Sequence, residues 1–135
     1  MIPDLIAEAP LPIVIHLCAA ILAAAFGAII FLNRKGTAFH KTLGWGFVVL
    51  MSITAISAIF IRRTEGIPNI AGFTPIHLFV VITALGLPHA LLRIRRGDVR
   101  GHAAGMIGLY VGAILIAGVL AFLPGRLMHA LVFRN

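Results

Sequence analysis

Residues 11–32 read LPIVIHLCAAILAAAFGAIIFL, a run of 22 residues without a charged side chain. An α-helix rises 1.5 Å per residue, so about 20 such residues cross the hydrocarbon core of a bilayer. Within lipid the backbone must satisfy its own hydrogen bonds, which leaves helices and closed barrels as the spanning structures. The run has none of the ten-residue alternation that is typical of barrel strands. It therefore predicts a membrane-spanning helix.

Three further apolar stretches of similar length follow, at about Thr42–Ile61, Pro75–Leu92 and Ala103–Leu123. The connections at Asn33–Gly36 and Arg96–Asp98 are short and turn-like, and Arg63–Gly72 is the longest. Short connections place consecutive helices side by side and antiparallel. The predicted fold is all-α, an integral membrane up-down four-helix bundle that forms one domain over residues 1–135.

The composition excludes several classes of protein. Hydrophobic residues make up 61% and charged residues 11%, whereas a soluble domain carries about 25% charged residues. So few charges cannot cover a water-facing surface, which argues against a soluble enzyme, a disordered chain and a nucleic-acid-binding domain. The net charge of +7 is better explained by basic residues at helix ends that meet lipid head groups. The single cysteine, Cys18, forms no internal disulfide and is expected to be a small buried hydrophobe.

The basic residues also predict the orientation of the bundle. The first and third connections carry a net charge of +6, and the remaining termini and connection carry +1. The positive-inside rule then places these two connections in the cytoplasm and both termini outside. The first helix lacks a basic flank of the kind that signal peptides have, so we expect it to be retained.

Six histidines are the most informative polar residues: His16, His40, His77, His89, His102 and His129. Ionisable groups at membrane depth are costly and are functional candidates by default. His16 and His77 lie near the outer ends of the first and third helices. His40 and His102 precede the second and fourth helices at the inner face. Because alternate helices of an up-down bundle are diagonal neighbours, the chain offers two cross-bundle histidine pairs at matched depths.

Paired histidines suit b-type haem, whose iron takes axial ligands on opposite faces. Glycines beside the inner pair, Gly44 and Gly105, would leave room for a flat macrocycle. Lys41 and Arg100 could bind the haem propionates at the inner boundary, and Arg126 could do so outside. Two haems at two depths would form an electron path through the membrane.

Ordinary roles for the same histidines stay open. His40 and His102 could simply lie at the lipid interface, and one interhelical hydrogen bond would satisfy each of His16 and His77. His89 follows a proline and could bond to the loosened backbone, or join His40 and His102 in a three-histidine zinc or copper site. In these cases the protein binds no haem.

Small residues recur every four positions on two of the predicted helices, at Ala19, Ala23 and Gly27 and at Ala104, Gly108 and Gly112. Such faces let helices approach closely. They fit general packing within the bundle or an interface in an oligomer. Tyr110 lies on the fourth helix, and its hydroxyl needs a hydrogen-bond partner that the sequence does not identify.

Several short motifs carry a resemblance to a known family. They are LNRKGTAFHKTLG at residues 32–44, GFTPIHL at 72–78, RGDVRGHAAGM at 96–106, Ala117-Gly118 and PGRLM at 124–128. Together they resemble a family of small bacterial membrane proteins catalogued as domain of unknown function 2306. The resemblance implies a four-helix fold in a bacterial inner membrane. His16, His40, His77 and His102 match its recurrent histidines, whereas His89 departs from its pattern.

Two functions follow as expectations. The first is binding of haem b through the two histidine pairs for transmembrane electron transfer, with a redox partner. The second is a cofactor-free accessory subunit, packed against a larger respiratory or photosynthetic complex or against copies of itself. No Ser/His/Asp set or phosphate-binding loop is present, and no acidic residue lies within a predicted span. Hydrolytic catalysis is therefore poorly supported, and whether the protein is an enzyme stays open.

Overall fold

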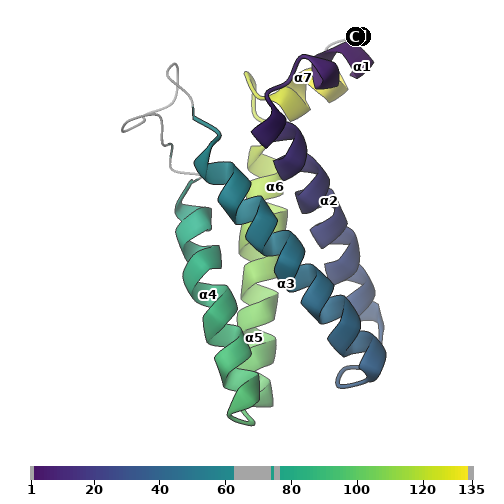
Figure 1. Ribbon diagram of the computed structural model, residues 1–135, viewed down its shortest axis with the longest axis vertical. Helices are drawn as coiled ribbons and strands as arrows, with labels where there is room; N and C mark the ends of the chain where they lie inside the picture. The colour runs from purple at the N-terminus through teal and green to yellow at the C-terminus, as the bar shows by residue number, and fades with distance from the viewer. Residues whose placement is uncertain (1, 63–73, 75–76, 134–135) are drawn as a thin grey trace.

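Four helical spans lie side by side in the computed structural model, which describes residues 2–62, 74 and 77–133 (Figure 1). The first three are α2 (Leu11–Leu32), α3 (Ala38–Ile59) and α4 (Leu78–Arg95). The fourth, Val99–Leu120, is one continuous rod built from α5 (Val99–Leu109), η2 (Tyr110–Ile116) and α6 (Ala117–Leu120). Within the described residues, these four are long and apolar enough to cross a membrane. The predicted all-α, four-span architecture is confirmed.

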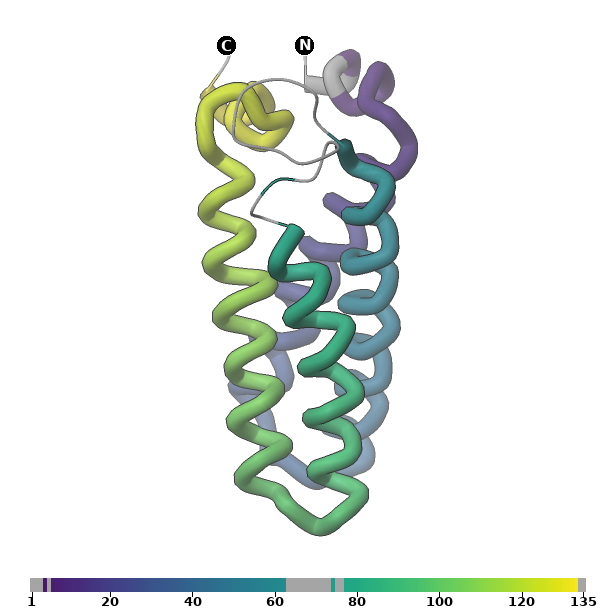
Figure 2. The backbone as a smooth tube through the Cα atoms, turned by 90° about the vertical axis from the view of Figure 1, so that its left-hand side faces the viewer, coloured from purple at the N-terminus to yellow at the C-terminus, as the bar shows by residue number. Residues whose placement is uncertain are grey.

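The spans follow one another around the bundle. α2 packs on α3, α3 on α4 and α4 on α5, and η2 closes the circle by contacting both α2 and α4. Two short helices, α1 (Ile2–Ala7) and α7 (Leu127–Phe133), contact each other at one end of the bundle (Figure 2). We call this the terminal end, and the opposite end, with the α2–α3 and α4–α5 connections, the turn end. α2 and α4 are thus diagonal neighbours, as are α3 and α5.

The second span begins four residues earlier than the apolar pattern predicts. Thr37 is the N-cap of α3, and its hydroxyl accepts a hydrogen bond from the backbone N–H of His40 at 3.1 Å. This bond satisfies one of the free N–H groups of the first turn. The helix therefore takes in polar residues that a hydropathy pattern leaves out, and His40 lies inside it rather than before it.

The fourth span begins early for the same reason. Asp98 is the N-cap of α5, and its carboxylate accepts a bond from the N–H of Gly101 at 2.8 Å. His102 therefore lies inside the first turns of the helix. The third span begins at Leu78 and continues to Arg95, whereas the predicted connection at 63–72 lies outside the described residues.

The small residues of α2 are buried inside the bundle. Ala19, Ala23 and Gly27 are buried, and a methyl group on Gly27 would collide with the ring of Tyr110. The Tyr110 hydroxyl donates to the carbonyl of Ala24 at 2.9 Å, which identifies its partner. This face therefore serves packing between the spans, as the first of the two interpretations expected.

Two other residues face outward. Cys18 is exposed, so the expectation that it is buried was wrong; on a spanning helix, this surface meets lipid. On α5, Gly108 has open space around it and Ala104 is exposed. The α2 stripe is thus covered by the bundle, and this part of the α5 stripe is not.

Candidate functional site

A cavity of about 580 Å³ lies between the spans in the terminal half of the bundle. Ligand pockets in proteins commonly measure about 300–1,000 Å³. All four spans contribute to its wall, and seven of the lining residues are alanines. The alanines that line it include Ala20, Ala24, Ala55, Ala58, Ala117 and Ala121. Because methyl side chains on facing helices do not reach each other, they leave this space open.

The polar groups of the cavity are few. His16 and His77 both line it, and Arg62 and Arg126 lie at its terminal end. The two histidines are near enough for a charge on one to act on the other. The structure thus brings together the pair that was predicted from the diagonal positions of the first and third spans.

His16 is held by the neighbouring helix α3. Its Nδ1 lies 2.9 Å from the carbonyl oxygen of Thr54 and 3.3 Å from the hydroxyl of Ser57. A carbonyl only accepts, so Nδ1 carries the proton and donates it. The neutral ring then has its lone pair on Nε2, the atom with which histidine commonly binds metals.

His77 makes a different set of bonds. Its Nδ1 accepts from the backbone N–H of Thr74 at 3.0 Å. Its Nε2 donates to the carbonyls of Ile61 at 2.9 Å and Ala58 at 3.1 Å. These carbonyls lie at the C-terminal end of α3, and the Ala58 carbonyl also accepts from the backbone N–H of Ile61 at 3.1 Å. His77 thus fastens the start of α4 to the end of α3, and both ring nitrogens are engaged.

The second histidine pair lies near the turn end. His102 donates from Nδ1 to the carbonyl of Ala90 at 2.9 Å, which leaves its lone pair on Nε2. His40 is near enough to interact electrostatically with His102. The Nδ1 of His40 is buried and has no hydrogen-bond partner among the described residues.

The other residues predicted to contact a cofactor are two glycines, Gly44 and Gly105, and three basic residues, Lys41, Arg100 and Arg126. A methyl group on Gly44 would meet nothing within 4 Å, whereas one on Gly105 would lie 2.9 Å from Cβ of Ala90. The space beside Gly105 is thus filled by α4. Lys41 and Arg100 are exposed at the turn end, and Arg126 lines the terminal cavity.

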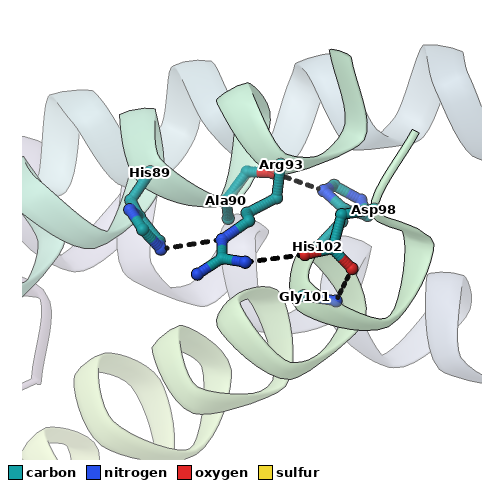
Figure 3. Close-up of polar contacts among 6 residues, drawn as sticks. All are labelled: His89, Ala90, Arg93, Asp98, Gly101 and His102. Atoms are coloured by element: carbon teal, nitrogen blue, oxygen red, sulfur yellow. Dashed lines mark hydrogen bonds and ion pairs between the residues drawn. The ribbon is translucent and has the colours of Figure 1, made fainter. Parts of the chain in front are cut away.

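His89 points toward Arg93, whereas His102 points toward the carbonyl of Ala90 (Figure 3). His89 is exposed and accepts a hydrogen bond from Nε of Arg93 at 3.2 Å. No group of three metal-ligating side chains occurs within the described part of the chain. The alternative of a three-histidine metal site with His40 and His102 was therefore wrong.

Arg93 also forms an ion pair at the α4–α5 connection. Its Nη1 donates to Asp98 at 2.7 Å (Figure 3). The hydrogen bond from the Gly101 N–H, together with the Arg93 guanidinium, holds the pKa of Asp98 below its ordinary value. This connection is a structural clamp between two spans.

Sequence reasoning missed Arg62 and Thr54 as parts of the terminal site. Both are visible in the sequence only as an arginine at the end of a span and a threonine within one. The signal that could have located the site is the recurrence of alanines at positions 20, 24, 55 and 58. Such small residues occur both where helices pack closely and where they leave a cavity, so the sequence does not distinguish these two outcomes.

Comparison with known proteins gives one match. Residues 13–133 match the family described as "Predicted membrane protein (DUF2306)". The match covers most of the chain, so the protein belongs to this family, and the suspected resemblance is confirmed. No curated protein and no solved structure matches the chain.

Proposed function

We propose that this member of the DUF2306 family binds haem b in its terminal cavity and transfers electrons across the membrane. One observation carries the proposal: two histidines from diagonal spans line a single cavity with methyl-rich walls. Haem requires an apolar slot and a nitrogen ligand for its iron. When bound, it supplies one-electron chemistry that the side chains of this protein lack.

The residues of the cavity fit this group in two respects. His16 holds a lone pair on Nε2 because its Nδ1 bonds to Thr54. Arg62 and Arg126 line the terminal end of the cavity, where they suit the carboxylates of the macrocycle. His16 would therefore hold the iron without changing its own hydrogen bonds.

His77 is the opposing ligand in this proposal, and it must change its bonds. Its Nε2 has to leave the carbonyls of Ile61 and Ala58 to face the iron. His16 would hold the group in the resting arrangement of side chains, and His77 would add a second nitrogen ligand once its Nε2 is released.

The second pair, His40 and His102, is proposed as ligands of a second haem nearer the turn end, with Gly44, Lys41 and Arg100 around it. The lone pair on Nε2 of His102 and the enclosed Nδ1 of His40 support this. The filled space at Gly105 requires the ring to lie on the Gly44 side. An electron path through a bacterial inner membrane, with the turn end in the cytoplasm, is the setting that we propose.

The test is the optical spectrum of the purified, membrane-extracted protein. We expect a Soret band, and an α band that appears on reduction. His16→Ala should remove the terminal haem, and His77→Ala should shift it from low-spin to high-spin. His89→Ala is the matched control, because His89 is exposed and its hydrogen bond is to Arg93 of its own helix. A native protein without iron or colour would refute the proposal.

A second candidate is a cofactor-free subunit of a larger membrane complex or a homo-oligomer. The exposed Ala104 and Gly108 favour it, since small residues on an outward face permit close approach by another helix. In that case the preparation is colourless, and Gly108→Leu dissociates the complex. A coloured protein that stays monomeric would exclude it.

A further inference from the structure

The fourth span changes its helical geometry beside the cavity. Over η2, Tyr110–Ile116, the backbone is a π-helix, and the N–H of Ala117 bonds to the carbonyl of Gly112, five residues earlier. In an α-helix this bond would reach back four residues. A π-helical turn therefore accommodates one extra residue, and such turns are rare and frequently lie at functional sites.

The extra residue shifts which side chains face the bundle. Leu109 is buried at the end of α5. At about 100° per residue, a continuous α-helix would next point 113, 116 and 120 in the same direction. Within η2 both Ala113 and Ile114 line the cavity. Beyond η2, Ala117 and Ala121 line it, whereas Leu120 does not and Ile116 is 49% exposed. The inward positions are thus displaced by one residue after η2.

This one-residue displacement determines which side chains of the fourth span line the cavity, and therefore how large they are. Without it, Ile116 and Leu120 would face the cavity; with it, Ala117 and Ala121 do so. Two large branched side chains are exchanged for two methyl groups. Gly118 lies beside them in the same wall.

The start of η2 is fixed in place. The Tyr110 ring packs on Gly27, and its hydroxyl bonds to Ala24 of α2. These contacts fix the rotation of the helix at Tyr110. The extra residue therefore changes the direction of the side chains that follow Tyr110, and not of those before it. All residues beyond η2 take the shifted orientation.

We propose that η2 contains one inserted residue whose role is to open the terminal cavity, and that Ala117 and Ala121 determine its selectivity for a broad, flat ligand. The identity of that ligand as haem rests on the proposed function above. The register shift and the open wall do not depend on it.

The register is tested by thiol labelling in intact membranes, in a Cys18→Ser background. Single Ala117→Cys and Ile116→Cys variants are exposed to a water-soluble, membrane-impermeant thiol reagent from the terminal side. Because such reagents need a hydrated thiolate, Ala117→Cys should react on the order of tenfold faster. Equal rates, or faster reaction of Ile116→Cys, would overturn the proposal.

Two changes of length sharpen this test. Deletion of Val111 removes the extra residue, so the span becomes a regular α-helix in which Ala117 and Ala121 still point inward. A cysteine at position 117 should therefore still react faster than one at position 116. One alanine inserted between Gly112 and Ala113 turns Ile116 and Leu120 inward. A cysteine at position 116 should then react faster than one at position 117. A deletion that reverses the order, or an insertion that preserves it, would refute an insertion at η2.

The ligand is tested separately by haem content. The deletion should retain the haem of the native protein, and the insertion should lose it. Ala117→Leu fills the cavity without changing the register, so it should lose haem even if the insertion variant fails to fold. Full haem in Ala117→Leu would show that this wall does not set selectivity. A native protein that never holds haem, but labels as expected, would refute the proposed function and keep the register.

Discussion

The two ends of the bundle use similar residues to opposite effect. At the terminal end, alanines from α2, α3 and the fourth span face one another across a cavity of about 580 Å³. At the turn end, Gly105 lies directly against Ala90, and His102 bonds to the carbonyl of the same residue. Small side chains thus leave space where helices are held apart, and remove it where they are drawn together.

The histidine pairs reflect the same difference. His16 and His77 bond across helices and border open space. His102 braces two helices that are already in contact. The open space at the terminal end thus makes His16 and His77 the better-placed pair. A ligand between His40 and His102 would have to lie on the Gly44 side, where an added methyl group meets nothing within 4 Å.

The largest effect is expected at the terminal end, from His16→Ala. Removing the only ring of the pair with a lone pair on Nε2 should abolish haem binding in the terminal cavity. Haem content per protein, measured by the pyridine haemochrome assay, checks this. Unchanged content would show that the cavity does not bind haem through His16.

Gly105→Leu should destabilise the turn end. The new Cβ would lie 2.9 Å from Cβ of Ala90 and 3.5 Å from its Cα, a contact that requires backbone movement. Overpacking of this kind costs about 1–3 kcal/mol. Unfolding in detergent by denaturant measures the loss.

Gly44→Ala is the matched control for that substitution. A methyl group there meets nothing within 4 Å, so the change should leave stability unaltered or raise it by about 0.5–1 kcal/mol through helix propensity. Equal destabilisation by the two variants would contradict the filled space at Gly105.

Tyr110→Phe should have a smaller effect. It removes the hydrogen bond to the Ala24 carbonyl and keeps the ring against Gly27. A neutral hydrogen bond contributes about 0.5–1.5 kcal/mol. Thermal unfolding should therefore occur at a slightly lower temperature, while the labelling order of positions 116 and 117 stays as in the native chain. A reversed order would show that the hydroxyl alone fixes the register.

The smallest effect is expected at the α4–α5 connection. The pKa of Asp98 is lowered in the folded protein, so its carboxylate stabilises the fold above the unfolded pKa, and this contribution is lost as the pH falls through the folded value. Asp98→Asn should remove this acid dependence. Unfolding measured from pH 6 down to about 3 should show a flatter profile for the variant. An identical slope would mean that Asp98 contributes nothing to it.

The sequence was sufficient for the four-span bundle and for the diagonal placement of the spans that carry the histidines. Charge-free runs of about 20 residues leave few alternatives in a bilayer, and diagonal pairing follows from short connections. The second and fourth spans begin at Ala38 and Val99, earlier than hydropathy predicts. The reason is that capping by Thr37 and Asp98 extends each helix into polar sequence. A hydropathy pattern does not detect capping residues of this kind.

The cavity could not be predicted, because it depends on how far apart the helices lie. Ala90 and Ala117 are the same residue, yet one fills a contact and the other lines an open wall. The π-helical η2 was equally invisible in the sequence of Tyr110–Ile116. Both features arise from tertiary packing that no local pattern encodes.

The most direct measurement is the reduced-minus-oxidised absorption spectrum of the native protein beside His16→Ala, each normalised to protein. A native Soret and α band whose intensity falls in the variant, with His89→Ala unchanged, is the predicted result. A native protein that is colourless after expression with ample haem, or a variant with undiminished bands, would contradict the assignment of the terminal cavity.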